Sequence, residues 1–404
     1  MISVEEAQRR VLEPLSPIGI ERVSLVDGLG RVLAEDVVAR LSHPPADVSS
    51  MDGYALRAAD LAQAPATLPV VGESAAGHPF AGEVGPGQAV RIFTGAHLPK
   101  GADAVAMQED CQAAPGQVTV KVAVKPGNFI RKAGMDFAAG QVGLSAGRRL
   151  TARDIGLLAS MNICWLSVRR RPKVAILSSG DELALPGDPV GPERIISSNS
   201  IGLCALVTAL GGQPFDLGIA PDDPAALAAL AQQSKGADLV VTSGGASEGE
   251  YDHVKAALGP IGLEVGFHKI AMRPGKPLIF GRLGQMPMLG LPGNPVSALV
   301  TAQLFLKPML RALMGESPAV SPLARARLGR DIGANDIRQD YLRAALSLNG
   351  DGEWVATPFD RQDSAMMSAL AKADLLVVRP PKAPPAQAGA WVPVLPLADG
   401  VLNT

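Results

Sequence analysis

The sequence contains few cysteines, histidines and aromatic residues, and neither sign of charge is in excess. Its three cysteines include no C-x-x-C pair, which argues against zinc sites and favours buried thiols over disulfides. The five histidines form no H-x-x-H or H-E-x-x-H pattern. Aromatic residues make up 4% of the chain, and the net charge is −2. Nucleic acid is therefore not an expected partner, because little is present to stack on bases or to attract phosphates over a wide surface.

The N-terminus and the apolar stretch 155–168 argue against export and against a membrane. Residues 1–10 place acids before bases and lack the apolar centre of a secretion signal. The stretch 155–168 is shorter than a bilayer span and includes Ser160 and Asn162, so it predicts a helix that runs into a buried strand. We expect a soluble, cytoplasmic protein with no membrane partner.

Length and composition predict several globular domains. Hydrophobic residues make up 47% of the 404 residues and charged residues 19%, values typical of packed cores. Helical spacing gives way to β-like runs, then to alternating strands and helices, then to β-like runs again. We predict a multidomain α/β plus β protein. Its parts are a discontinuous helical domain (1–43 and 145–170), a β-rich inserted domain (44–144), a doubly wound parallel α/β domain (171–318) and a small C-terminal β-barrel (319–404).

Three strand-to-loop transitions predict a ligand crevice in the α/β domain. Residues 174–177 lead into S-S-G-D-E, 238–242 into S-G-G-A-S, and 288–291 into P-G-N-P. The carboxyl ends of parallel strands meet at one edge of a sheet, where the backbone N–H groups of such loops can approach an anion. A phosphorylated ligand is the natural expectation.

Several acidic residues of the α/β domain fall at or just after predicted strand ends. They are Asp181, Glu182, Asp222, Asp223, Glu248, Glu250 and Asp252. Acids beside phosphate-binding loops often hold Mg²⁺, which prefers one or two carboxylates together with phosphate oxygens and water. The alternative is that Asp223 and Asp252 only cap helices, since aspartate is a preferred cap. Because these acids converge with the glycine loops, metal binding is favoured over capping alone.

A basic segment follows the acidic one. Lys269, Arg273 and Lys276 lie in K-I-A-M-R-P-G-K-P, where Pro274 and Gly275 force a turn. The turn can bring Arg273 and Lys276 to the entrance of the same site, where they would bind an oxyanion. A solvated cluster on an edge strand is the alternative.

The β-rich insertion offers three further polar candidates. Asp52, Thr94 and Asp136 lie next to or near glycines in predicted loops. Spacing alone favours ordinary turn formation for Asp52 and Thr94 and leaves Asp136 ambiguous.

Eight motifs in a fixed order resemble the molybdopterin molybdenumtransferase family, called MoeA in bacteria and represented in animals by the E domain of gephyrin. They are S-M-D-G-Y-A, R-I-F-T-G-A, R-K-A-G-M-D, S-S-G-D-E-L, S-N-S, T-S-G-G-A-S-E-G-E-Y-D, R-P-G-K-P and L-P-G-N-P-V-S. The resemblance covers essentially the whole chain.

This resemblance implies the last step of molybdenum cofactor biosynthesis. Molybdate would be inserted into adenylylated molybdopterin, with Mg²⁺ as cofactor and release of AMP. It implies an elongated homodimer, in which the helical domain serves dimerisation and the active cleft joins the α/β domain of one subunit to the insertion of the other. It also points to the molybdopterin adenylyltransferase and to acceptor molybdoenzymes as protein partners.

The resemblance assigns roles at matching positions. Asp222 and Asp252 correspond to the metal ligands. Asp52, Thr94, Asp136, Glu182 and Lys276 correspond to catalytic residues. The residues expected to bind molybdate, pterin or AMP are Ser179, Gly180, Ser243, Gly244, Gly245, Lys269, Arg273, Pro277, Gly293, Asn294, Ser297, Arg338 and Ser364.

Two other functions remain open from the sequence. The preceding enzyme of the pathway, the adenylyltransferase, resembles the α/β unit alone, so the insertion and the C-terminal domain argue against it. A non-catalytic scaffold is the second alternative, because the gephyrin relative also clusters receptors. No additional peptide-binding segment is evident for that role.

Overall fold

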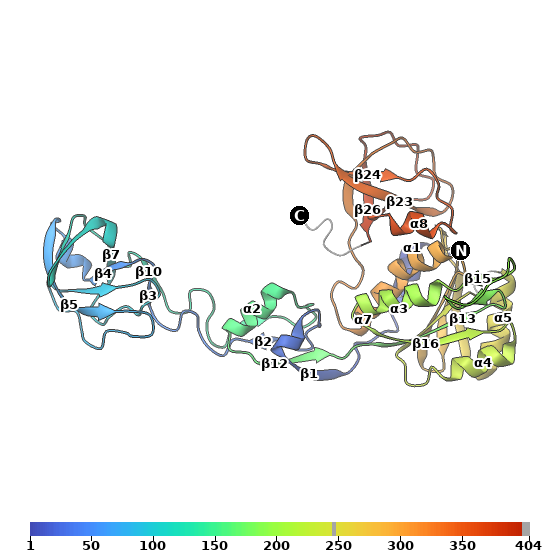
Figure 1. The fold of residues 1–404 in the computed structure, drawn as a ribbon, viewed down its shortest axis with the longest axis horizontal. Helices are drawn as coiled ribbons and strands as arrows, with labels where there is room; N and C mark the ends of the chain where they lie inside the picture. Colours follow the sequence, from blue (N-terminus) through green and yellow to red (C-terminus); the bar gives the residue numbers. More distant parts are fainter. Residues whose placement is uncertain (245–247, 398–404) are drawn as a thin grey trace.

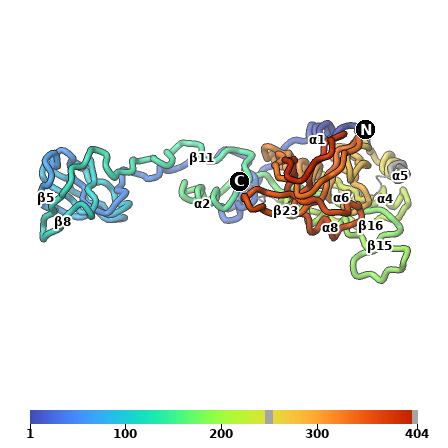
Figure 2. The backbone as a smooth tube through the Cα atoms, turned by 90° about the horizontal axis from the view of Figure 1, so that it is seen from above, coloured from blue at the N-terminus to red at the C-terminus, as the bar shows by residue number. Residues whose placement is uncertain are grey.

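The molecule is elongated, with its parts arranged along one axis. The structure, a computed structural model, describes residues 1–244 and 248–397, with no side-chain description for 248–252. The β-rich insertion lies at one end, and the α/β domain and the C-terminal domain lie at the other (Figure 1). The view from above shows the same separation (Figure 2). The insertion is therefore remote from the α/β domain of its own chain.

The α/β domain is built on a six-stranded sheet with the order β16-β13-β17-β21-β20-β18. The strands are β13 (Lys173–Ser179), β16 (Gln213–Ala220), β17 (Leu239–Ser243), β18 (Leu263–Lys269), β20 (Pro277–Leu283) and β21 (Met286–Leu291). The first four in the sheet order are parallel, as predicted, whereas β20 and β18 are antiparallel to their neighbours. The prediction of a fully parallel sheet is therefore wrong at β20 and β18. Only Gly284 and Gln285 join β20 to β21, whereas a parallel crossover needs a dozen or more residues.

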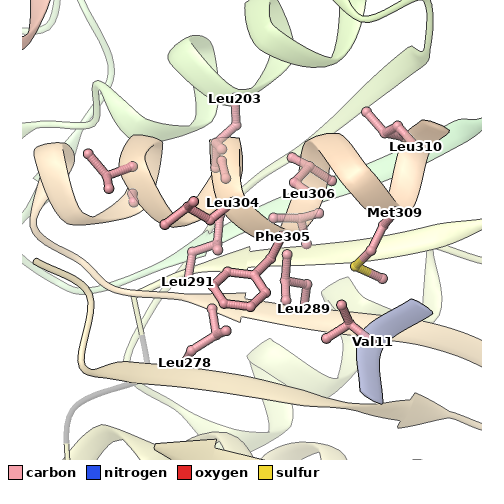
Figure 3. Packing of buried hydrophobic residues seen from close by; sticks show 14 of the residues in the cluster. Val11, Leu203, Leu278, Leu289, Leu291, Leu304, Phe305, Leu306, Met309 and Leu310 are labelled. Carbon is pink, nitrogen blue, oxygen red and sulfur yellow. The ribbon is translucent and has the colours of Figure 1, made fainter. Parts of the chain in front are cut away.

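Helices cover both faces of this sheet, which confirms the doubly wound architecture. They are α3 (Asn199–Ala209), α4 (Pro224–Gln232), α5 (Glu248–Leu258), α6 (Pro295–Thr301) and α7 (Lys307–Leu313), with a π-helical turn at Ala302–Leu306. One core joins α3, α6 and α7 to one face, and a second core joins α4 and α5 to the other. In Figure 3, Phe305 lies among Leu278, Leu289 and Leu291 of the sheet.

The long helical run Pro295–Leu313 forms the centre of the first core. By length and composition it is long and apolar enough to cross a membrane, but 78% of its 18-residue apolar window is buried inside the fold. Packing against the sheet therefore accounts for its composition. Asn294 stands at its N-cap position but makes no side-chain capping bond, contrary to prediction, whereas Asp223 caps α4 through a 2.7 Å bond from the Ala226 N–H.

The region between the two ends contains more strand than the predicted helical domain. It includes β1 (Ile20–Ser24) paired with β12 (Trp165–Arg169), β2 (Val37–Val38) paired with β11 (Val142–Leu144), a 3₁₀ turn (Leu25–Gly28) and α2 (Ala152–Ser160). The stretch 155–168 is thus a helix that runs into a strand, as predicted. The first helix, α1 (Val4–Leu12), packs instead on the α/β core, because Val4, Ala7 and Val11 form a buried face against α7.

A capping box at the start of α2 gives a testable contribution to stability. Burial of Asp154 raises its pKa, but hydrogen bonds from Arg148 (3.0 Å) and from the Thr151 N–H (2.8 Å) outweigh burial, so the pKa lies below its ordinary value. A carboxylate with a lowered folded-state pKa stabilises the fold above its unfolded pKa, and this stabilisation is lost as the pH falls through the folded value.

We therefore expect Asp154→Asn to cost about 1 kcal/mol at neutral pH, with the difference from wild type shrinking below about pH 4. Urea unfolding of both proteins between neutral pH and about pH 4 or lower measures the loss of stability and its decrease with falling pH. Parallel pH profiles for the two proteins would contradict the assignment.

The insertion is β-rich, as predicted. Its six-stranded sheet has the order β7-β4-β6-β5-β9-β8. The strands are β4 (Gly53–Leu56), β5 (Ala66–Ser74), β6 (Ala89–Ile92), β7 (Ala104–Met107), β8 (Cys111–Ala114) and β9 (Gln117–Val120). A two-stranded ribbon of β3 (Val48–Ser49) and β10 (Ile130–Arg131) joins it to the middle region. Two 3₁₀ turns, Ala58–Leu61 and Gln108–Asp110, complete it.

The C-terminal domain is a closed five-stranded barrel, which confirms the predicted class. Its strands are β22 (Ala324–Leu328), β23 (Gln339–Leu348), β24 (Trp354–Pro358), β25 (Leu375–Arg379) and β26 (Trp391–Pro396). Pairing of β23 with β25 closes the ring. A short helix, α8 (Met367–Ala371), lies between β24 and β25, and β19 (Met272–Arg273) of the α/β domain pairs with β23.

All three cysteines are free. Cys111 and Cys204 are half-buried, and burial raises the pKa of both thiols to about 11. Cys164 is exposed, so the expectation of buried thiols is wrong at that position. It precedes β12 at the surface of the middle region.

Candidate functional site

A cavity of about 520 Å³ lies at the carboxyl ends of β13, β17 and β21. All three predicted strand-to-loop transitions contribute to its wall, through Ser179, Gly244 and Gly293 among others. A further wall comes from β14 (Leu183–Ala184) and β15 (Ile195–Ile196), two short strands that follow β13. The sequence therefore locates this crevice correctly.

Glycine is required where two of these loops meet. Gly244 has φ +88°, and a Cβ on it would lie 2.9 Å from the carbonyl oxygen of Ser179. A Cβ on Gly293 would lie 3.8 Å from the Cα of Gly244. The loops after β17 and β21 thus contact each other, and their backbones face the crevice without intervening side chains.

Two hydroxyl-bearing residues that were not among the predicted site residues lie in the wall of the crevice, one at the end of β13 and one shortly before α3. Ser178 and Ser197 line the crevice, are at most 3% exposed, and have hydroxyls without a hydrogen-bond partner among the described residues. Asn199 donates to Ser243 Oγ (2.8 Å) and to the Gly293 carbonyl (2.7 Å), which ties two of the loops together. Ser198 at the N-cap position of α3 makes no side-chain capping bond, and Ser198 and Asn199 line the crevice, so the uncapped first turn of α3 borders it. The sequence S-S-N-S at 197–200, directly before an apolar helical segment, could have indicated these residues as part of the crevice.

Two carboxylates form a pair at the ends of β13 and β16. The Asp222 N–H donates to Asp181 Oδ1 (3.1 Å), and the Asp181 N–H donates to Asp222 Oδ2 (3.4 Å). Glu182 follows directly and lines the crevice. The Asp223 carboxylate caps α4, so this residue follows the capping alternative and not the metal-binding one.

The remaining acidic candidates cannot be placed. Gly245 and the side chains of Glu248, Glu250 and Asp252 lie outside the described part of the chain. Over the residues that are described, no group of three or more His, Cys, Asp or Glu side chains could hold a metal. The Asp181–Asp222 pair provides enough ligands for Mg²⁺, which needs only one or two carboxylates when phosphate oxygens and water complete its coordination shell.

The C-terminal barrel brings Arg338 to Arg273. Asp336 Oδ2 is 3.0 Å from Arg338 Nη2 and 3.3 Å from Arg273 Nη1, so one carboxylate oxygen pairs with both arginines. Arg273 Nη2 also pairs with Asp340, a buried residue of β23. Hydrogen bonds from Arg338 hold the pKa of Asp336 below its ordinary value, whereas burial raises the pKa of Asp340 despite the bond from Arg273.

Sequence neighbours of two other residues expected to bind the oxyanion line the crevice. Pro277, which follows Lys276, lines the crevice, and so does Ala365, which follows Ser364. The Val296 N–H donates to the Ser364 carbonyl (3.1 Å), which fixes the C-terminal domain to the start of α6 beside the buried Ser297. Lys269 ends β18, the strand next to β20.

Asp52 and Thr94 form a close pair in the insertion. The N–H and the hydroxyl of Thr94 both donate to Asp52 Oδ1, at 2.7 and 2.8 Å, and these bonds lower the pKa of Asp52. Asp136 lies near the connection to the middle region, where its N–H donates to the His43 carbonyl (3.0 Å). Figure 1 shows that the insertion is far from the α/β domain, whose strands β13, β17 and β21 end at the crevice, so one chain does not bring these residues to it.

The fold and the crevice define a class: α/β proteins that hold anionic ligands at the carboxyl edge of a doubly wound sheet, here with two β domains attached. Three family descriptions cover most of the chain. Residues 2–162 match "MoeA N-terminal region (domain I and II)", residues 175–312 match "Probable molybdopterin binding domain", and residues 325–397 match "MoeA C-terminal region (domain IV)". The chain belongs to the MoeA family of molybdopterin molybdenumtransferases, and it is an enzyme of a late stage of molybdenum cofactor biosynthesis.

Relatives match over nearly the full length. The chain is 38% identical over 405 residues to the molybdopterin molybdenumtransferase of Haemophilus influenzae, with 98% of each chain covered. It is 35% identical over 404 residues to that of Bacillus subtilis, which covers 98% of this chain and 94% of the relative. A crystal structure of the MoeA protein from Pyrococcus horikoshii superposes with a TM-score of 0.82 at 34% identity, covering 98% of this chain and 99% of that one.

Proposed function

We propose that this enzyme inserts molybdate into adenylylated molybdopterin in a Mg²⁺-dependent reaction that releases AMP. The single observation that carries the proposal is the presence of two anion-binding surfaces that share chain segments. The crevice presents hydroxyls and loop backbones, and a second cavity of about 300 Å³ is lined by Arg273, which lies four residues before Pro277 of the crevice wall. Asp336 pairs Arg273 with Arg338. A substrate with phosphates and a separate oxyanion requires both.

The phosphate groups would occupy the uncharged part of the crevice. Glu182 is the only ionisable side chain among the described residues that line it. The uncapped start of α3 would supply neutral backbone donors, which suit phosphate at a helix N-terminus, and the unpaired hydroxyls of Ser178 and Ser197 are buried behind the same wall. Asn199 keeps the loops at a fixed separation, so the donors are placed before the ligand arrives.

The metal would lie beside Asp181 and Asp222, with Asp252 as the further ligand that the family resemblance assigns. Mg²⁺ bound there supplies charge neutralisation at the phosphoanhydride oxygens. The chain's own contribution is the mutual hydrogen bonding that fixes Asp181 and Asp222 at neighbouring strand ends.

Molybdate would bind where the α/β domain meets the C-terminal barrel. Arg273 and Arg338 offer planar donor forks and Lys276 a point charge, and these match the geometry of a tetrahedral oxyanion. Ser297 and Ser364 are proposed to donate to the same anion, because their segments are joined at the start of α6.

The complete active site would form in a homodimer. Asp52, Thr94 and Asp136 are proposed to reach the crevice of the partner subunit, since they are remote from their own. The middle region exposes apolar side chains suited to burial between subunits: Ile20, Val26, Leu29, Val38, Leu41, Val142 and Trp165. We further propose that the enzyme works in the cytoplasm between the adenylyltransferase and the acceptor molybdoenzymes.

One assay tests the proposal against both alternatives. With adenylylated molybdopterin, Mg²⁺ and molybdate, the enzyme is expected to release AMP in proportion to molybdenum incorporated. Net adenylylation of molybdopterin from ATP would indicate the adenylyltransferase function instead. Neither activity, together with no thermal stabilisation by saturating molybdate, Mg²⁺ and pterin, would favour the scaffold.

A further inference from the structure

The two arginines at the domain junction already hold an anion, and it belongs to the protein. Arg273 ends β19 of the α/β domain, and Arg338 precedes β23 of the barrel. Asp336 places a single carboxylate oxygen, Oδ2, within 3.3 Å of one guanidinium and 3.0 Å of the other. An oxyanion that bridges the same two arginines would have to use this position.

Asp336 differs from the second carboxylate at this junction. Asp340 is 4% exposed and lies on a strand of the barrel, so its contact with Arg273 is part of the packed structure. The side chain of Asp336 is 42% exposed and lies in the loop before β23. Its other oxygen, Oδ1, accepts the Arg338 N–H at 2.8 Å, which anchors the residue while Oδ2 makes the ion pairs. Only Asp336 can therefore leave the arginines without unfolding the junction.

We propose that Asp336 is an internal competitor that occupies the oxyanion site until the substrate anion displaces it. The inference rests on the proposed function for the identity of that anion, a tetrahedral oxyanion such as molybdate. Displacement imposes a fixed cost on any incoming anion, because two ion pairs must be exchanged. Weakly binding monoanions then fail to enter, and the two arginines remain paired and neutralised between turnovers.

Asp336→Asn tests whether Asp336 competes with the incoming anion or only supports the structure of the site. Asparagine keeps an Oδ1 acceptor for the Arg338 N–H but removes the charge at the position of Oδ2. We expect the variant to bind molybdate about five- to tenfold more tightly at fixed ionic strength, as measured by titration calorimetry. Perrhenate, a tetrahedral monoanion, should gain by a similar factor because it displaces the same carboxylate. In turnover, KM for molybdate should fall while kcat does not rise.

Asp360→Asn is the matched control. Asp360 is an exposed carboxylate of the same domain that pairs with Arg330, and its replacement should leave anion affinity unchanged. Asp336→Ser provides a second, shorter neutral side chain at the site, and it should gain affinity like Asp336→Asn. Unchanged or weaker anion binding in both Asp336 variants, with normal thermal unfolding, would overturn the proposal and show that Asp336 supports the arginines.

The outcome also distinguishes this proposal from the proposed function. If the Asp336 variants gain affinity for molybdate and perrhenate but the wild type shows no molybdate-dependent AMP release, the competitor is supported while the proposed function fails. If the wild type binds molybdate and the variants gain nothing, the competitor fails alone. If no protein binds either anion, both fail.

Discussion

Replacing Asp222 by asparagine is expected to lower the rate of AMP release by about 100-fold or more. Asp222 is exposed at the end of β16 and is held to Asp181 by reciprocal hydrogen bonds, so the pair is set for a divalent ion. Asparagine keeps the shape and one acceptor but removes the charge that a hard cation requires. Because the side chain is exposed, the free energy of unfolding should change by less than about 0.5 kcal/mol.

Asp223→Asn is the matched control for this experiment. Asp223 is the next residue in the chain, but its carboxylate caps α4 through the Ala226 N–H. Asparagine is an equally good cap, so activity and stability should both stay near wild type. Steady-state AMP release over a range of Mg²⁺ concentrations measures the two variants. Wild-type activity in Asp222→Asn at limiting Mg²⁺ would remove Asp222 from the metal site.

Asp52→Ala is expected to lower turnover by about 100-fold while leaving AMP binding unchanged. The two bonds from Thr94 fix Asp52 Oδ1 and keep the carboxylate ionised, so this group presents a fixed negative charge at the surface. Since the proposed phosphate site is built from hydroxyls and loop backbones of the α/β domain, AMP binding should not depend on Asp52. Calorimetric titration with AMP and single-turnover AMP release give the two readouts.

Asp60→Asn controls for general damage to the insertion. Asp60 lies in the 3₁₀ turn Ala58–Leu61, beyond the far end of β4, where it accepts the Gly87 N–H at 2.8 Å. Its replacement should leave turnover intact. Equal loss of turnover in Asp52→Ala and Asp60→Asn would mean that the insertion needs only to be folded, and the catalytic assignment of Asp52 would be wrong.

The crevice could be predicted from the sequence because its signals are local. An apolar β-branched run followed by glycine, serine or proline marks the end of a buried parallel strand wherever it occurs. The cap at Asp223 is equally local. By contrast, β16 was missed because its residues are mostly exposed or half-buried and include Pro214 and Asp216, so no continuous apolar run marks it.

Other features depend on contacts between distant segments and have no local signature. The approach of Arg338 to Arg273 follows from the pairing of β19 with β23, across some 65 residues of chain. The strands β1 and β12 of the middle region pair across about 145 residues, so β1 was not predicted as a strand within the helical domain. The distance of the insertion from the crevice likewise follows from the long connections on either side of it, which carry no pattern that sets their direction.

An active site shared between subunits is tested most directly by combining the two inactive variants in one dimer. Co-expression of Asp52→Ala and Asp222→Asn chains with different tags, followed by two-step purification, isolates mixed dimers. If the crevice of one subunit works with the insertion of its partner, each mixed dimer has one intact site and should release AMP at about half the wild-type rate. If the catalytic residues act within a single chain, every chain carries a defect, and the mixed dimer will be as inactive as its parents.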